Sequence, residues 1–142
     1  MRKTVAPTLL ALVCAASLLA CAGGGGEAPQ TPDAVIDALK ALTDELADKV
    51  ESARDAKAGV AEAQSVLDSR KGEMAARIDA LKKSGRMSDP SARGRWLEAE
   101  VDNTQRVRDL KLKYLDASRS DPELKAALER LAADYDSMFK DR

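Results

Sequence analysis

The residues best suited to chemistry are the carboxylates and two cysteines, because the chain contains no histidine. Without an imidazole, neither a Ser-His-Asp or Cys-His nucleophile nor a His-ligated metal site is available. Glu98 and Asp102 are four residues apart, so on a helix they share a face and could act as a carboxylate pair. Arg95 and Arg106 lie near enough to neutralise both acids, which favours an exposed charged face. No P-loop, EF-hand loop or dinucleotide-binding turn is present. We therefore expect no enzymatic activity, cofactor or metal.

Both cysteines belong to a segment that resembles a secretory leader. Two cations near the start precede residues 5–20, which are mainly apolar but too short and too interrupted to span a bilayer. The segment ends in the motif Leu18-Leu19-Ala20-Cys21. This motif resembles the lipobox of bacterial lipoproteins, in which a small residue precedes the lipid-accepting cysteine. The resemblance implies that residues 1–20 are a signal peptide and that Cys21 is lipidated, anchoring the protein to a lipid bilayer.

A second interpretation of the same residues stays open. Ala20-Cys21-Ala22 also matches a plain secretory cleavage site, which would release a soluble protein. Under the lipobox interpretation Cys14 leaves with the signal peptide and Cys21 is acylated, so no thiol remains for a disulfide or a metal. Ala22 stands where an Asp would suggest retention in the inner membrane. The resemblance therefore implies the outer membrane facing the periplasm, or the outer face of the plasma membrane in a single-membrane host.

The rest of the chain divides into a linker and a helical domain. Residues 21–31 form a Gly-rich segment with the composition of a flexible tether. Residues 32–142 follow as one helical domain. A helix-capping residue precedes a proline three times, at Thr31-Pro32, Asp89-Pro90 and Asp121-Pro122. These motifs predict an all-α fold with helices over about 32–83, 90–118 and 122–140.

The apolar pattern of the first predicted helix favours one continuous rod. Apolar side chains recur every seven positions, at Leu39, Leu46, Ala53, Val60, Leu67, Met74 and Leu81. The second and third helices carry apolar residues three or four apart, including Leu97, Val101, Val107 and Leu110. The first helix would be roughly 78 Å long and the other two together roughly 72 Å. We therefore predict a long antiparallel, coiled-coil-like hairpin whose return arm is broken near Pro122. The alternative is a three-helix bundle, which requires the first helix to bend or break near Gly59 or Gly72.

A cationic segment marks the turn after the first predicted helix. Five cations lie within fourteen residues against the single acid Asp89, and an aromatic residue follows them; these residues are Lys82, Lys83, Arg86, Arg93, Arg95 and Trp96. In the hairpin this segment is the tip farthest from the lipid. It could contact an anionic partner such as a wall polymer, lipid headgroups or an acidic protein. The alternative is that the cations offset the helix dipole and solubilise a loop while Trp96 packs into the core.

These observations predict an envelope protein of structural or adaptor type. The formal net charge of -1 gives no reason to expect nucleic-acid binding. We expect a membrane-anchored bacterial lipoprotein whose helical surface binds another envelope protein or further copies of itself. The alternative function is a non-covalent cell-wall tether that binds an anionic polymer through the basic tip at residues 82–95.

Overall fold

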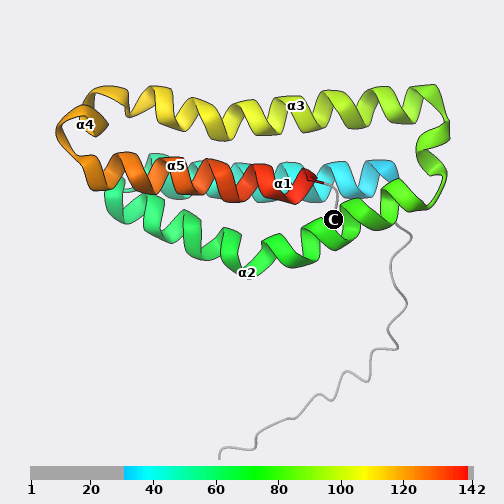
Figure 1. Ribbon diagram of the computed structural model, residues 1–142, viewed down its shortest axis with the longest axis horizontal. Coiled ribbons are helices and arrows are strands. Elements are labelled where there is room, and N and C mark those ends of the chain that lie inside the picture. Colours follow the sequence, from blue (N-terminus) through cyan, green and yellow to red (C-terminus); the bar gives the residue numbers. More distant parts are fainter. Residues whose placement is uncertain (1–30, 141–142) are drawn as a thin grey trace, which may run out of the picture.

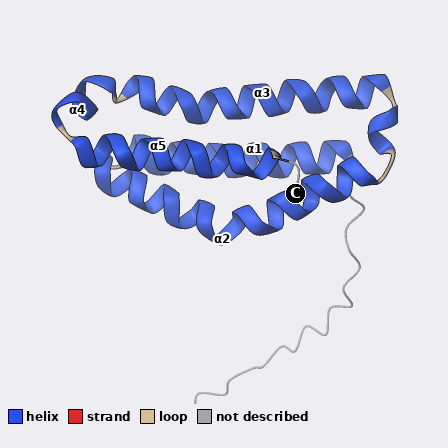
Figure 2. Ribbon diagram, in the orientation of Figure 1, coloured by secondary structure: helices blue, strands red, loops and turns tan. Residues whose placement is uncertain are grey.

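The computed structural model describes residues 31–140, so the expected signal peptide, Cys21 and most of the tether lie outside the described residues. Its helices are α1 (Pro32–Ser52), α2 (Ala56–Lys83), α3 (Pro90–Lys113), α4 (Leu115–Ser120) and α5 (Pro122–Asp136). Short 3-10 turns occupy Arg86–Ser88 and Ser137–Phe139. Residues 31–140 contain no strand, and Figure 2 shows helices joined by short loops. The predicted all-α class is confirmed.

The three predicted capping motifs begin helices as expected. The Thr31 side chain accepts a hydrogen bond from the Ala34 N–H at 3.2 Å. The carboxylates of Asp89 and Asp121 accept from backbone N–H groups in the first turns of α3 and α5. Each cap satisfies donors that have no partner within the helix, and each proline occupies a position where no N–H is needed. The predicted break of the return arm near Pro122 is confirmed, because α4 ends at Ser120 and α5 begins at Pro122.

The prediction of one continuous helix over residues 32–83 is wrong. The chain leaves α1 at Ser52, Ala53 is extended with φ -68° and ψ 140°, and Asp55 caps α2 by accepting from the Ala58 N–H at 2.9 Å. From there α2 runs back along α1 (Figure 1). The long hairpin built on a 52-residue rod is therefore not formed, because the chain reverses after α1.

Gly59 allows this reversal to be tight, although no helix breaks at Gly59 or at Gly72. A Cβ atom at residue 59 would lie 2.7 Å from the Lys49 carbonyl oxygen and 2.7 Å from the Ala53 Cβ. Only glycine permits the first turn of α2 to approach the end of α1 this closely. Gly72 lies inside α2, where a Cβ would meet nothing within 4 Å. The break required by the bundle alternative thus occurs a few residues before Gly59, at residues 53–55.

The four longer helices form a bundle rather than a two-helix hairpin. α1 packs against α2 and α3, and α5 packs against the same two helices from the other side (Figure 1). α1 and α5 therefore lie diagonally across the core. Thr43 of α1 and Tyr135 of α5 meet there, with their hydroxyl oxygens 2.6 Å apart, and both side chains are fully buried. Because the Thr43 hydroxyl donates to the Leu39 carbonyl, the Tyr135 hydroxyl donates to Thr43.

The core confirms the heptad pattern of α1 and α2, and confirms the pattern expected for α3 only at Val107 and Leu110. Leu39, Leu46, Val60, Leu67 and Leu81 are at most 1 % exposed. The buried face of α3 comprises Ala92, Trp96, Asn103, Val107 and Leu110. Leu97 and Val101, which the sequence pattern placed in the seam, are exposed. The helix predicted over 90–118 is interrupted at Tyr114, whose hydroxyl donates to the Val50 carbonyl at 3.2 Å.

Candidate interaction surfaces

The basic cluster, defined as Lys82, Lys83, Arg86, Arg93 and Arg95, lies at the end of the bundle where α1 begins. It spans the end of α2, the 3-10 turn and the first turns of α3. Arg95 Nε donates to Asp33 Oδ1 at 3.2 Å, which joins the cluster to the first turn of α1. The hairpin placed this segment, as the tip farthest from the lipid, at the opposite end of the domain from the first residues of the helix that begins at Pro32, and that placement is wrong. The reversal at residues 53–55 brings the end of α2 back to the start of α1.

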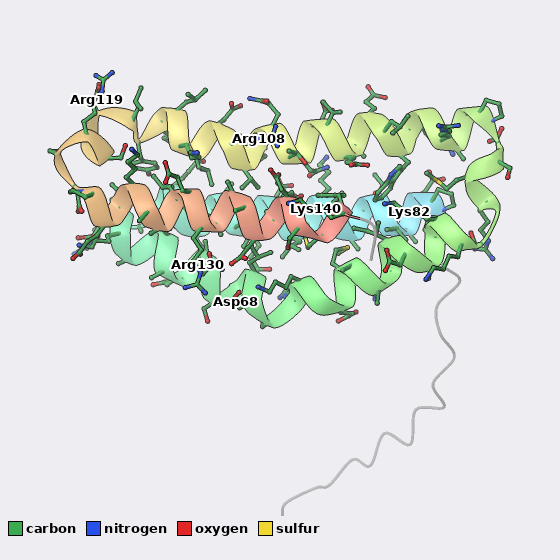
Figure 3. All side chains as sticks on the ribbon, in the orientation of Figure 1. Asp68, Lys82, Arg108, Arg119, Arg130 and Lys140 are labelled. Atoms are coloured by element: carbon green, nitrogen blue, oxygen red, sulfur yellow. The ribbon has the colours of Figure 1, made fainter. Side chains whose placement is uncertain are left out.

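The members of the basic cluster have different surroundings. Arg95 is held by Asp33 and by the Ser91 hydroxyl, whose oxygen lies 2.9 Å from Arg95 Nη1. Lys82 donates to the Phe139 carbonyl at 3.1 Å. Lys83, Arg86 and Arg93 are exposed. In Figure 3 Lys82 lies toward one end of the bundle, and Arg119 marks the other.

Trp96 is a core residue and is not available as a surface contact. It is 2 % exposed, and its ring centroid lies 6.4 Å from that of Phe139. Phe139 in turn lies 5.7 Å from the buried Tyr135 ring. The three rings close the core at the end of the bundle that carries the basic cluster. The packing interpretation of Trp96 therefore holds.

The candidate carboxylate pair, Glu98 and Asp102, lies in a groove of mixed charge between α1 and α3. The groove measures about 570 Å³, and its charged lining consists of Asp33, Asp37, Lys40, Asp44, Arg95, Glu98, Asp102 and Arg106. Arg95 and Arg106 pair with Asp33 and Asp44 of α1, at 3.2 and 3.3 Å, rather than with the acids of their own helix. These pairs join α1 to α3. Within residues 31–140, no group of three or more acidic or cysteine side chains is placed to hold a metal ion.

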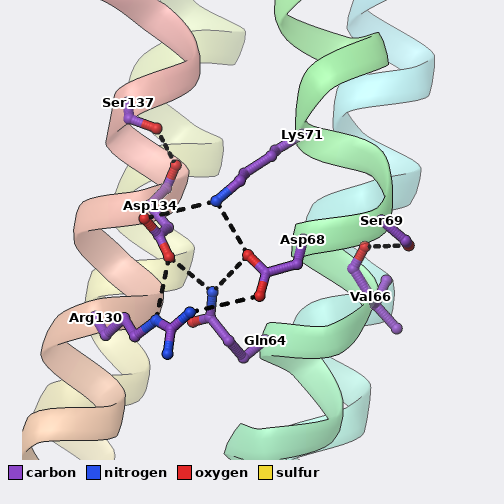
Figure 4. Close-up of polar contacts among 8 residues, drawn as sticks. All are labelled: Gln64, Val66, Asp68, Ser69, Lys71, Arg130, Asp134 and Ser137. Atoms are coloured by element: carbon purple, nitrogen blue, oxygen red, sulfur yellow. Dashed lines mark hydrogen bonds and ion pairs between the residues drawn. The ribbon is translucent and has the colours of Figure 1, made fainter.

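A second polar cluster connects α2 to α5 (Figure 4). Asp68 accepts from Gln64 at 3.1 Å and pairs with Lys71 at 3.0 Å and Arg130 at 3.6 Å. Asp134 accepts from Gln64 at 2.8 Å and pairs with Arg130 at 3.5 Å. Hydrogen bonds from Lys71 and Gln64 hold the pKa of Asp68 below its ordinary value. Two acids thus face two cations, and the cluster acts as a clamp between the helices. The Gln64 Oε1 atom is buried without a hydrogen-bond partner.

The outer face of α3 and α4 carries an apolar stripe that the sequence pattern did not identify as a surface. Leu97, Val101, Leu112 and Leu115 are 49 %, 65 %, 65 % and 44 % exposed. Their spacings of 4, 11 and 3 residues are close to whole helical turns, so the three residues of α3 share one face, and Leu115 begins α4 beside them. The helical spacing of these apolar residues is visible in the sequence. The same spacing is expected of a face buried in the core, so it does not identify an exposed surface.

No helix among residues 31–140 combines the length and the apolar character needed to cross a bilayer. No protein-family model, curated protein or solved structure matches the chain.

Proposed function

We propose that this protein is a lipid-anchored, non-enzymatic adaptor of the bacterial cell envelope that binds another envelope protein through the outer face of α3. The observation that carries the proposal is the apolar stripe at Leu97, Val101, Leu112 and Leu115, because these side chains are 44 to 65 % exposed. Isolated exposed aliphatic residues are normal on soluble proteins. Here three of them share one face of α3 and the fourth begins α4, so that two exposed apolar pairs form a surface suited to a partner.

The stripe has the geometry of a helix-binding surface. It consists of two apolar pairs, 97/101 and 112/115, whose nearer members are eleven residues or roughly 16 Å apart along the helix. Gln105 and Arg108 lie between the pairs, and Arg108 is engaged by Asp136 of α5 at 2.7 Å. An amphipathic partner helix with apolar residues about three turns apart would cover both pairs, as when the apolar face of a helix is recognised by a partner.

The proposed anchor rests on the resemblance of Leu18-Leu19-Ala20-Cys21 to a lipobox. Acylation of Cys21 would supply more than one acyl chain, which is enough for stable attachment to a bilayer. The wall-tether alternative has less support. It requires the basic cluster to reach away from the membrane, whereas Arg95 pairs with Asp33 at the start of α1.

Photo-crosslinking in intact bacterial cells tests the adaptor. A photoreactive amino acid replaces Val101 or Leu112, and in the control it replaces Ser65, an exposed residue of α2. We expect a single heavy adduct from positions 101 and 112, none from position 65, and a weaker adduct when Cys21→Ala removes the anchor. Equal adducts from all three positions, or none, would refute the proposed surface. An adduct of twice the chain's own mass would show that the surface binds a second copy of this chain rather than another envelope protein.

The anchor has its own test. Treatment of cells with globomycin, which blocks lipoprotein signal peptidase, should accumulate a precursor larger than the mature protein by the signal peptide. Cys21→Ala should abolish labelling by radioactive palmitate. A mature protein of unchanged size under globomycin would show that the leader is cleaved as a plain secretory signal.

A further inference from the structure

We propose that Lys83, Arg86 and Arg93 bind the anionic lipid headgroups of the bilayer in which Cys21 is anchored. The bundle then has a second membrane contact and a fixed orientation. This inference rests on the lipid anchor proposed above and adds the lipid class that the basic cluster recognises. It places the turn at residues 53–55 and α4 at the end directed away from the bilayer.

The position of the cluster comes from the reversal of the chain after α1. Because Arg95 pairs with Asp33 at 3.2 Å, the basic cluster lies beside the first residues of α1. Nine residues lie between Cys21 and Thr31, so ten Cα-to-Cα steps join the two. Ten such steps extend to about 35 Å at most, and a flexible chain of that length has a root-mean-square span of roughly 17 Å. The start of α1, and the cluster with it, is therefore held near the headgroups.

The charge of this end fits an anionic surface. Asp33 neutralises Arg95, and Lys82 is engaged by the Phe139 carbonyl, so the proposal does not depend on either cation. Lys83, Arg86 and Arg93 are exposed within eleven residues of the chain. Each cation near an anionic bilayer contributes roughly a fivefold gain in binding, so three give about a hundredfold. Screening limits this attraction to about 10 Å at 0.1 M salt, so the contact must be close and salt-sensitive.

A groove beside the cluster adds a surface that a phospholipid can use. It measures about 520 Å³, and its exposed or half-buried lining includes Lys82, Met87, Arg93, Leu97 and Glu100. Leu97 is 49 % exposed, and Met87 is half-buried. Cations next to exposed apolar atoms match the phosphate and upper acyl region of a lipid better than they match a fully hydrated polymer. The carboxylates of Glu100 and Asp89 oppose the attraction. We therefore expect the affinity for the bilayer to increase with its fraction of anionic lipid.

Vesicle co-sedimentation tests the inference with the full mature chain, residues 21–142, carrying Cys21→Ala so that acylation does not mask weak binding. The vesicles contain phosphatidylcholine alone or phosphatidylcholine with 30 mol% phosphatidylglycerol. The test variant combines Lys83→Glu, Arg86→Glu and Arg93→Glu. Its matched control makes the same change in net charge at the opposite end of the bundle, with Arg54→Glu, Arg119→Glu and Lys125→Glu. Circular dichroism verifies that both variants are folded.

The unaltered chain should bind the anionic vesicles at least tenfold better than the neutral ones, and this preference should fall when salt is raised from 50 to 300 mM. The test variant should bind the anionic vesicles no better than it binds the neutral ones. The control should bind the anionic vesicles within about threefold of the unaltered chain. Equal losses in the two variants, or no preference for anionic vesicles, would overturn the inference. Binding to soluble wall fragments or to polyglutamate without vesicle preference would overturn it in favour of a polymer or an acidic protein.

The failure of this inference is distinguishable from failure of the proposed anchor. If globomycin and palmitate labelling support acylation while the test variant and its control behave alike, the headgroup contact alone is wrong. If acylation is absent while the test variant loses vesicle binding, the anchor is wrong and the basic cluster is the membrane attachment.

Discussion

The reversal of the chain at residues 53–55 predicts opposite effects for the same substitution at two glycines of α2. At Gly72 an added Cβ meets nothing within 4 Å, so Gly72→Ala removes only the conformational cost of glycine in a helix. We expect it to raise the free energy of unfolding by about 0.5–1 kcal/mol. At Gly59 the added Cβ would lie 2.7 Å from the Lys49 carbonyl oxygen and 3.0 Å from the Val50 Cα.

Two of the three close contacts at Gly59 are with backbone atoms and the third is with the Ala53 Cβ, and none of these atoms can rotate out of the way as the end of a long side chain can. Overpacking of this kind costs about 1–3 kcal/mol, and the double backbone contact favours the upper part of that range. After the propensity gain of about 1 kcal/mol is subtracted, Gly59→Ala should lower the free energy of unfolding by about 1–2 kcal/mol. The two variants should therefore differ by about 1.5–3 kcal/mol.

Urea unfolding of the unacylated mature chain, followed by circular dichroism at the helix band, measures this difference. The transition midpoints of the two variants should be separated by roughly 1 M urea or more, with unchanged slopes. In a straight helix over residues 32–83 both glycines would have ordinary helical surroundings, and both substitutions would stabilise. A Gly59→Ala variant as stable as Gly72→Ala would therefore refute the tight packing of α2 on the end of α1.

Three further predictions concern the core and one helix cap. Thr43→Val should lower stability by about 1–3 kcal/mol in urea unfolding, because it removes the acceptor of the buried Tyr135 hydroxyl; adding Tyr135→Phe should restore part of the loss. Burial raises the pKa of Tyr135, so its neutral form is favoured in the folded state, and stability should fall as the pH rises above about 10, the ordinary tyrosine value. Tyr135→Phe should reduce the loss of stability between pH 9 and 11. An unchanged loss would contradict the attribution of this pH dependence to the buried Tyr135 hydroxyl. Asp121→Ala should cost about 1 kcal/mol in thermal or urea unfolding, whereas Asp121→Asn should retain most of the stability, because the asparagine oxygen still accepts from the first turn of α5.

Local capping signals made most helix starts predictable. Thr31, Asp89 and Asp121 each stand before a proline, and a capping side chain with a preset φ angle acts within a single turn. Asp55 caps α2 in the same way but without a following proline, so its signal was weaker. The heptad pattern continued across residues 53–55. A repeat of buried residues cannot separate one rod from two helices that face the same core, because both arrangements bury the same positions.

The buried face of α3 was difficult to recognise in the sequence because it contains one polar residue, Asn103. Trp96, Asn103 and Leu110 recur every seven positions and are all buried. Asn103 satisfies its amide by donating to the Ala99 carbonyl at 2.7 Å, which makes its burial tolerable. From the sequence alone the competing spacing through Leu97 and Val101 looked more apolar. Selecting between the two faces requires knowing that α3 packs between α1 and α5, which is a tertiary property.

The members of the basic cluster were predictable from composition, but their location was not. Charge density along the chain identifies Lys83, Arg86 and Arg93 whatever the fold. Whether they lie near or far from Thr31 depends on the turn at residues 53–55. The same turn therefore decides whether the cluster is aimed at a distant polymer or at the bilayer of the proposed anchor.

The most direct test of this account is one distance across the end of the bundle. Spin labels at Ala34→Cys and Ser91→Cys, placed in the mature chain with Cys21→Ser, report whether the start of α3 lies beside the start of α1. Neighbouring packed helices have axes 8–10 Å apart, so pulsed electron resonance or line broadening should give about 10–20 Å. A continuous helix over residues 32–83 would separate these positions by roughly 75 Å. A distance near that value would contradict both the reversal of the chain and the membrane-facing position of the basic cluster.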